Sequence, residues 1–217
     1  MDLLRRSASA LWQDPGLLLV SLGFMAVQYV TGLKAGVLDI QSPWWILTMA
    51  VILLGSPLVH TWLIIRSRAL FERRRVALRS ALSQMAPCFV RLLLGEIVVN
   101  ALVLGGLVAF LIPGVYIGIR LIYYKQAIII EHLSLSAALF RSAEFTVEWR
   151  TVFAILGQVT PIWTISFAVV AAATFFEFGI AGDVLITLGS AVSFAWVNAF
   201  LTLRYRNRSA MSEAPGR

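Results

Sequence analysis

Long apolar runs dominate this chain and limit what it can fold into. A helix needs about 20 apolar residues to cross a hydrocarbon layer about 30 Å thick, and several runs here reach that length. Inside lipid every backbone N–H and C=O has to pair within the protein, so helices are expected and open strands are excluded. We therefore predict an all-α membrane bundle of about six transmembrane helices, the fourth short and polar. The predicted spans are residues 15–33, 44–65, 89–112, 115–130, 151–176 and 180–203.

The composition agrees with a membrane environment. Hydrophobic residues make up 59% of the chain and charged residues only 13%, whereas soluble domains carry about 25% charged residues. The first apolar run follows Arg5-Arg6, as the core of a signal peptide would, but it is too long and lacks a convincing small-x-small cleavage site. We read it as a span within a single membrane domain, residues 1–208, which precedes a flexible tail at 209–217.

Lysine and arginine are divided unevenly between the two sides of the predicted spans. Cytoplasmic loops retain these residues and translocated loops do not. One side has Lys34 alone, together with Asp39, Glu177 and Asp183. The other side holds Arg5, Arg6, Arg66, Arg68, Arg73, Arg74, Arg75, Arg79, Arg91, Lys125, Arg141, Arg150, Arg204, Arg206, Arg208 and Arg217. We predict both termini on the cytoplasmic side. Topology thus accounts for the net charge of +7, and no nucleic-acid partner is expected.

Three basic stretches carry apolar residues at helical spacing and are predicted to lie in the headgroup plane. They are residues 2–13, 66–86 and 134–149, the last with Ser134 as a candidate N-cap. Each precedes a pair of spans, and Arg-Ser-Ala occurs in all three, beginning at Arg6, Arg79 and Arg141. The pattern indicates a candidate threefold helix-hairpin repeat. A fourth Arg-Ser-Ala, beginning at Arg208, precedes no span.

The region around the fourth span carries a pattern known from bacterial membrane proteins. It reads Ile112-Pro113-Gly114, then Arg120-Leu121, then Ile128-Ile129-Ile130-Glu131, and finally Ser136-Ala137-Ala138-Leu139-Phe140-Arg141-Ser142. Residues 107–157 resemble the YciC-like membrane families and the membrane domain attached to some glycerophosphoryl diester phosphodiesterases. The resemblance implies an all-helical bundle of about six spans in the bacterial cytoplasmic membrane and no agreed biochemistry. It does not imply phosphodiesterase activity, because the chain has no soluble catalytic domain.

Polar residues inside the third and fourth spans call for partners, since an ionisable group in the bilayer is costly. The two spans are antiparallel and share the Pro113-Gly114 turn. At ~1.5 Å rise per residue, Glu96, Asn100 and Lys125 lie about 25, 20 and 18 Å below that turn. A cluster of these three side chains is therefore feasible.

Arg120 lies only about 10 Å below the same turn, by the same rise, which is too high for Glu96. It approaches the outer end, where Asp183 of the sixth span is available, and we predict that the two side chains are in contact. Such groups either line a polar pocket or path for a substrate or lipid headgroup, or form structural ion pairs.

Motifs of catalysis and metal binding are missing from the sequence. There is no Gly-x-Ser-x-Gly elbow, His-Glu-x-x-His motif or P-loop lysine. His60 and His132 are the only histidines, and Cys88 is the only cysteine. Ser56 and His60 share a helix face, but no acid is placed to orient them as nucleophile and base. We expect no enzyme, no metal and no cofactor.

Two functions remain open. The first is a non-catalytic accessory or scaffold subunit, or a lipid-interacting protein, whose basic inner face meets anionic headgroups, other membrane subunits or a second copy. Its candidate contacts are Arg73, Arg74, Arg75 and Arg79, since each cation near a bilayer contributes about 1 kcal/mol toward anionic lipid. The alternative is a small-molecule or lipid transporter that uses a polar site around Arg120 and Asp183.

Overall fold

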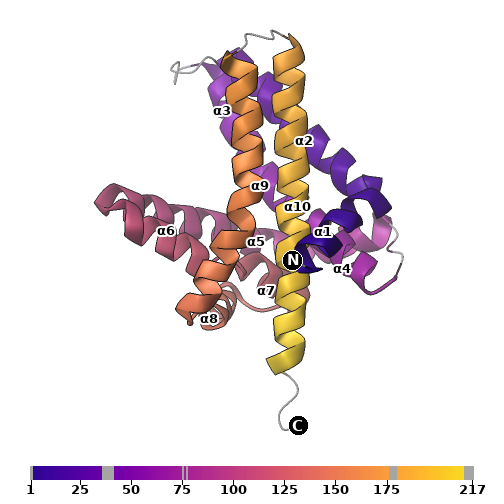
Figure 1. Ribbon diagram of the computed structural model, residues 1–217, viewed down its shortest axis with the longest axis vertical. Helices are drawn as coiled ribbons and strands as arrows, with labels where there is room; N and C mark the ends of the chain where they lie inside the picture. Colours follow the sequence, from indigo (N-terminus) through magenta and orange to yellow (C-terminus); the bar gives the residue numbers. More distant parts are fainter. Residues whose placement is uncertain (1, 36–41, 75, 77, 176–179, 213–217) are drawn as a thin grey trace.

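The computed structural model describes residues 2–35, 42–74, 76, 78–175 and 180–212, and the regular structure within them is entirely helical (Figure 1). This finding confirms the predicted all-α class. The elements are α1 (Asp2–Gln13), α2 (Pro15–Ala35), α3 (Pro43–Ala50), the π-helical turn η1 (Val51–Gly55), α4 (Ser56–Phe71), α5 (Leu78–Ala109), α6 (Leu111–Arg120), α7 (Tyr124–Ile130), α8 (Leu135–Phe145), α9 (Trp149–Phe175) and α10 (Ile180–Ser212).

Several helices are long and apolar enough to cross a membrane. Among the described residues these are Pro43–Phe71, Arg79–Ala109 and Ala181–Ala210. Helices α1 and α2 meet at a bend of 83° and would add a fourth if they form one broken span. Large apolar side chains such as Leu19 and Leu104 face outward, as lipid-facing positions do. The chain therefore has the helices of a membrane protein, and the count of six spans stays a prediction.

Helix α10 is at the centre of the arrangement. It packs against α1, α2, α4, α7 and α9, and it runs beside α9 over most of its length (Figure 1). The hairpin of α5 and α6 projects sideways, across the direction of α9 and α10 rather than alongside them (Figure 1). The packed part of the molecule therefore lies where this hairpin, α4, α7 and α10 meet.

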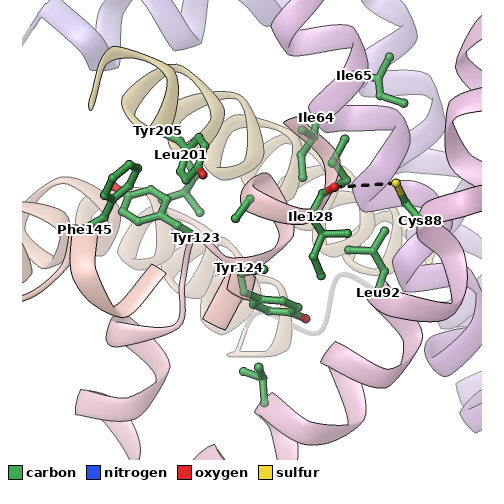
Figure 2. Packing of buried hydrophobic residues seen from close by; sticks show 14 of the residues in the cluster. Ile64, Ile65, Cys88, Leu92, Tyr123, Tyr124, Ile128, Phe145, Leu201 and Tyr205 are labelled. Carbon is green, nitrogen blue, oxygen red and sulfur yellow. Dashed lines mark hydrogen bonds between the residues drawn. The ribbon is translucent and has the colours of Figure 1, made fainter. Parts of the chain in front are cut away.

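The core at this junction is built from apolar and aromatic side chains (Figure 2). Tyr123 and Phe145 both pack against Tyr205 of α10, with ring centroids 5.8 and 5.1 Å away. On the other side of α7, Cys88 of α5 lies with its Sγ 3.8 Å from the carbonyl oxygen of Ile128. Close packing of this kind stabilises helix contacts inside lipid, where burial from water contributes little.

The second predicted span is longer than expected and contains a π-helical turn. Helices α3 and α4 join through Val51–Gly55, directly before Ser56 and Pro57. Proline lacks an N–H group and its ring clashes with the preceding turn of a helix. The widened turn accommodates Pro57 without ending the helix, and it presents Ser56 toward α5.

The predicted turn at Pro113-Gly114 is wrong, because the chain reverses at Phe110. Phe110 has an extended backbone, with φ −163° and ψ 146°, whereas Pro113 lies in the first turn of α6, where the missing N–H has no helical partner. Gly114 instead allows close helix approach: a Cβ there would lie 2.5 Å from the backbone nitrogen of Leu107. The close packing of α6 against α5 therefore depends on Gly114, which was predicted to lie in the turn.

Two predicted segments are divided differently in the structure. The interfacial helix at 66–86 is wrong as a single element: α4 ends at Phe71, the chain turns at Arg73, and α5 begins at Leu78. Apolar residues keep their helical spacing across that turn, so the spacing gave no sign that the helix ends there. The fourth span is broken into α6 and α7, and the expected tail is helical through Ser212. Asp39, Arg75, Glu177 and residues 213–217 lie outside the described residues.

Candidate functional site

The break between α6 and α7 is held in place by α8. Ser142 Oγ accepts a hydrogen bond from Tyr123 N–H at 3.0 Å and donates to the carbonyl of Arg120 at 2.9 Å. Thr146 Oγ1 donates to the same carbonyl at 3.0 Å. A helix end leaves backbone groups unpaired, and the two hydroxyls pair them. Ser134 N-caps α8, as predicted, by accepting from Ala137 N–H.

Arg120 takes part in this junction and does not meet Asp183. Its guanidinium donates to the carbonyl oxygen of Thr146 at 2.8 Å and lies over the ring of Tyr116. Asp183 is in the first turn of α10, beside Tyr29 of α2. The predicted Arg120–Asp183 contact is therefore wrong: the break after Arg120 brings its side chain to the end of α8, away from the start of α10.

Glu96 and Lys125 form the ion pair that their depths in the membrane had made feasible. Lys125 Nζ donates to Glu96 Oε1 at 2.6 Å, and their side chains are 15% and 11% exposed. Ser56 Oγ donates to the same oxygen at 2.9 Å. Helices α4, α5 and α7 thus meet at one carboxylate. Lys125 has no other acceptor among the described residues, so two of its three N–H groups remain unused.

This ion pair lines a cavity of about 260 Å³ between α4, α5, α7, α9 and α10. Asn100, predicted to join the cluster, lies on the cavity wall. Three buried polar atoms at the wall, His60 Nδ1, Tyr124 Oη and Gln126 Oε1, have no hydrogen-bond partner among the described residues. An unpaired buried polar atom costs about 1–3 kcal/mol. A polar molecule in the cavity could therefore form hydrogen bonds with these unpaired atoms.

An apolar groove of about 420 Å³ adjoins the cavity along α9. Ile122 and Trp163 line both spaces, so the groove and the cavity adjoin at these two side chains. The groove wall otherwise consists of aliphatic side chains and two threonines: Ile119, Ile155, Leu156, Val159, Thr160 and Thr164. A cavity with several polar groups in its wall, next to an apolar groove, suits a molecule with a polar head and an apolar part.

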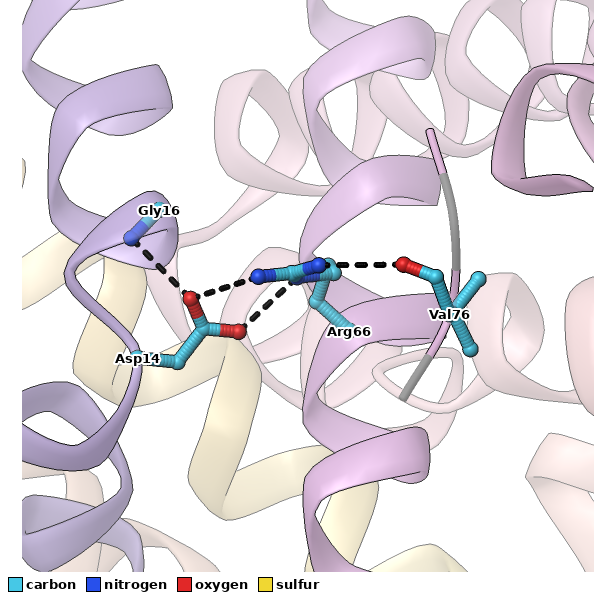
Figure 3. Close-up of polar contacts among 4 residues, drawn as sticks. All are labelled: Asp14, Gly16, Arg66 and Val76. Atoms are coloured by element: carbon cyan, nitrogen blue, oxygen red, sulfur yellow. Dashed lines mark hydrogen bonds and ion pairs between the residues drawn. The ribbon is translucent and has the colours of Figure 1, made fainter. Parts of the chain in front are cut away.

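A second ion pair joins α4 to the bend between α1 and α2 (Figure 3). Asp14 accepts from Arg66 through both carboxylate oxygens at 2.8 Å, and its Oδ1 also accepts from Gly16 N–H at 3.0 Å. Arg66 donates further to the carbonyl of Val76 at 3.2 Å. Asp14 therefore caps α2 and fixes α4 against it.

Glu131, from the family-like pattern, connects α7 to α8 and α10. Its Oε1 accepts from the Tyr205 hydroxyl at 2.6 Å and from Ser209 at 3.1 Å, and its Oε2 lies 3.4 Å from Arg141 Nε. Burial alone lowers the pKa of the Arg141 guanidinium, but the hydrogen bond to Glu144 and the charge of Glu131 raise the pKa above its ordinary value. This arrangement is a structural anchor.

Among the basic residues proposed to contact lipid, Arg73, Arg74 and Arg79 are exposed. Arg75 lies outside the described residues. No group of three or more His, Cys, Asp or Glu side chains in the described ranges is placed to hold a metal ion. Ser56 donates to Glu96 rather than to His60. The arrangement of polar groups at the cavity can bind a polar group.

Sequence reasoning found Glu96, Asn100 and Lys125 and missed two other cavity residues, Gln126 and Asn198. Their signal was available, since both are polar residues inside predicted spans. Comparisons of the chain with protein-family models, curated proteins and solved structures found no match. The resemblance to the YciC-like families therefore stays a prediction, and function has to be argued from the site.

Proposed function

We propose that the chain is a non-catalytic, multi-pass membrane protein that binds an amphiphilic molecule. The polar head occupies the cavity at Glu96 and Lys125, and the apolar part lies in the adjoining groove. The observation that carries this proposal is the set of three buried, unpartnered atoms, His60 Nδ1, Tyr124 Oη and Gln126 Oε1, on the wall of a cavity that already contains an ion pair.

The charge of the cavity favours a net-neutral head. Glu96 and Lys125 neutralise each other, so a head with a full net charge would leave one charge unpaired in a poorly hydrated space. Hydroxyl, ester or zwitterionic groups would instead accept from the unused N–H groups of Lys125, and a hydroxyl or ammonium group of the head would donate to Gln126 Oε1. The membrane itself supplies molecules with such heads.

The groove supports an amphiphile over a compact polar solute. It lies along α9, and Trp163, which lines both the groove and the cavity, is 54% exposed on the outer surface. In a bilayer this surface faces acyl chains. A lipid-like molecule would then enter sideways from the membrane, with its apolar part remaining in contact with the groove.

The membrane placement belongs to the same proposal. Six spans, both termini on the cytoplasmic side and a bacterial cytoplasmic membrane are supported by the distribution of arginine and by the resemblance to the YciC-like families. A threefold repeat has weaker support, because Ser7 and Ser142 of the shared tripeptide are buried whereas Ser80 is exposed. Transport through a site formed by Arg120 and Asp183 lacks support, since these residues lie apart.

Bound lipid can be measured directly on the purified protein. We would extract the full chain in mild detergent and determine retained molecules by native mass spectrometry. Gln126→Leu removes the unpartnered Gln126 Oε1, and His60→Phe removes the unpartnered His60 Nδ1. Both variants keep a side chain of similar size. If each atom bonds the ligand, each variant should lower occupancy about fivefold, as expected for about 1 kcal/mol per hydrogen bond.

The matched control is Gln28→Leu, a half-buried glutamine on α2 that lines neither the cavity nor the groove. It should retain the ligand as the unmodified chain does. An unmodified chain without a bound amphiphile, or equal occupancy in all three variants, would reject the proposal. The accessory-subunit function gains support instead if the chain purifies without lipid in a larger complex.

A further inference from the structure

Three arginines from distant parts of the chain line another pocket. This pocket shares no lining residue with the cavity at Glu96 and Lys125. Arg6 comes from α1, Arg73 from the turn after α4, and Arg206 from the C-terminal part of α10. The pocket has a volume of about 320 Å³, and its remaining polar wall includes Ser9 and Asn207. Tertiary packing of α1 on α10 therefore brings together charges that the sequence separates by about 200 positions.

Negative charge is scarce around this pocket. None of the described residues in its wall is an aspartate or glutamate. Glu72 lies 3.9 Å from Arg206 Nε, but the same oxygen is closer to Arg68 Nε, at 3.1 Å. Arg6 and Arg73 form no ion pair with any described residue. Like charges so placed repel one another unless an anion lies between them.

The backbone at Arg73 gives an independent reason to assign a role to its side chain. Arg73 has φ 54°, the left-handed conformation that favours glycine. Its N–H donates to Leu70 O at 3.0 Å, and Arg74 N–H donates to Ala69 O at 2.8 Å, which is the usual glycine-ended helix terminus. Arginine at this position costs about 1–2 kcal/mol. Strain of this kind concentrates at functional positions.

We propose that this pocket binds a phosphoryl group. Guanidinium groups match phosphate oxygens through paired N–H donors, and three of them supply the charge that a phosphate monoester or a phosphodiester requires. The inference differs from the diffuse lipid contact predicted for Arg73, Arg74, Arg75 and Arg79. Of the described members of that set, Arg73, Arg74 and Arg79, only Arg73 lines this pocket, and Arg6 and Arg206 come from near the two ends of the chain.

The test uses the purified full chain in nonionic detergent with two probes. Short-chain phosphatidylglycerol represents a lipid headgroup, and inorganic phosphate represents a free anion. Arg73→Gly removes the guanidinium and relieves the backbone, so folding is retained. Arg206→Gln removes a second guanidinium. Each variant should weaken probe binding about tenfold in a native mass spectrometry titration, as expected for one charged hydrogen-bonding group.

Arg79→Gln is the control, because Arg79 is an exposed arginine of the same basic region that does not line the pocket. It should change binding less than twofold. Loss of phosphatidylglycerol binding alone identifies a lipid headgroup as the source, and loss of binding to both probes identifies a general phosphoryl site. The proposal is overturned if neither probe binds the unmodified chain, or if Arg79→Gln weakens binding as much as Arg73→Gly.

Discussion

Two partly buried ion pairs of this protein differ in how many further partners they have. Asp14 and Arg66 pair through two contacts of 2.8 Å, and each has a further partner: Asp14 accepts from Gly16 N–H and Arg66 donates to the carbonyl of Val76. Glu96 and Lys125 share a single 2.6 Å contact. The first pair joins three helical segments at a bend, whereas the second faces a cavity. Further partners on both members indicate a structural role for the first pair, whereas the unused N–H groups of Lys125 leave capacity for a ligand in the second.

The largest effect on stability is expected at the Asp14–Arg66 pair. Asp14→Ala removes the cap of α2 and leaves Arg66 without its carboxylate. We expect the free energy of unfolding to fall by about 3 kcal/mol, from the lost cap and the broken pair together. Thermal unfolding in detergent, followed by circular dichroism, measures the change. Arg68→Gln, which breaks a more exposed pair on α4, should change stability little. Equal losses of stability in Asp14→Ala and Arg68→Gln would contradict the special structural role of the Asp14–Arg66 pair.

The hairpin that carries Glu96 should be next in sensitivity. A Cβ at Gly114 would lie 2.5 Å from the backbone of α5, whereas one at Gly118 would meet only Val103, at 3.6 Å. Gly114→Ala should therefore cost about 2 kcal/mol through overpacking, and Gly118→Ala should be nearly neutral. The same unfolding measurement compares them. Similar stability for the two variants would show that the hairpin adjusts freely.

The α6–α7 break, which positions Lys125, should show a smaller loss. Ser142→Ala leaves the buried N–H of Tyr123 unpaired, and we expect a cost of about 1.5 kcal/mol. Ser80→Ala is the matched control, because Ser80 belongs to the same Arg-Ser-Ala tripeptide but is exposed. A loss at Ser80 as large as at Ser142 would indicate a common role for the tripeptide and favour the repeat.

The smallest effect on stability is expected at the Glu96–Lys125 pair. Replacing both members with apolar residues of similar length removes the charges together, which is often close to neutral. The double variant with Glu96→Met and Lys125→Met should therefore stay within about 1 kcal/mol of the unmodified chain and lose its bound amphiphile. A loss of stability as large as that of Asp14→Ala would make this pair structural too.

The sequence predicted the helical class, and it made the Glu96–Lys125 contact feasible because helical rise converts residue number into depth. It failed at positions decided by tertiary contact. Arg120 was assigned to Asp183 by depth alone, but the helix ends after Arg120 because Ser142 and Thr146 hold its carbonyl. Arg73 breaks a continuous apolar pattern through a left-handed backbone that no residue preference indicates.

The central claim, that the cavity and groove hold an amphiphile inside the membrane, can be tested in intact cells by photocrosslinking. A benzoylphenylalanine at position 163 would lie at the junction of both spaces, and one at position 165 would face the surrounding lipid, since Ile165 is 59% exposed and lines neither space. We predict one dominant adduct at position 163 that disappears when Glu96 and Lys125 are replaced, and a mixture of bulk lipids at position 165. The same mixture at both positions would contradict the account.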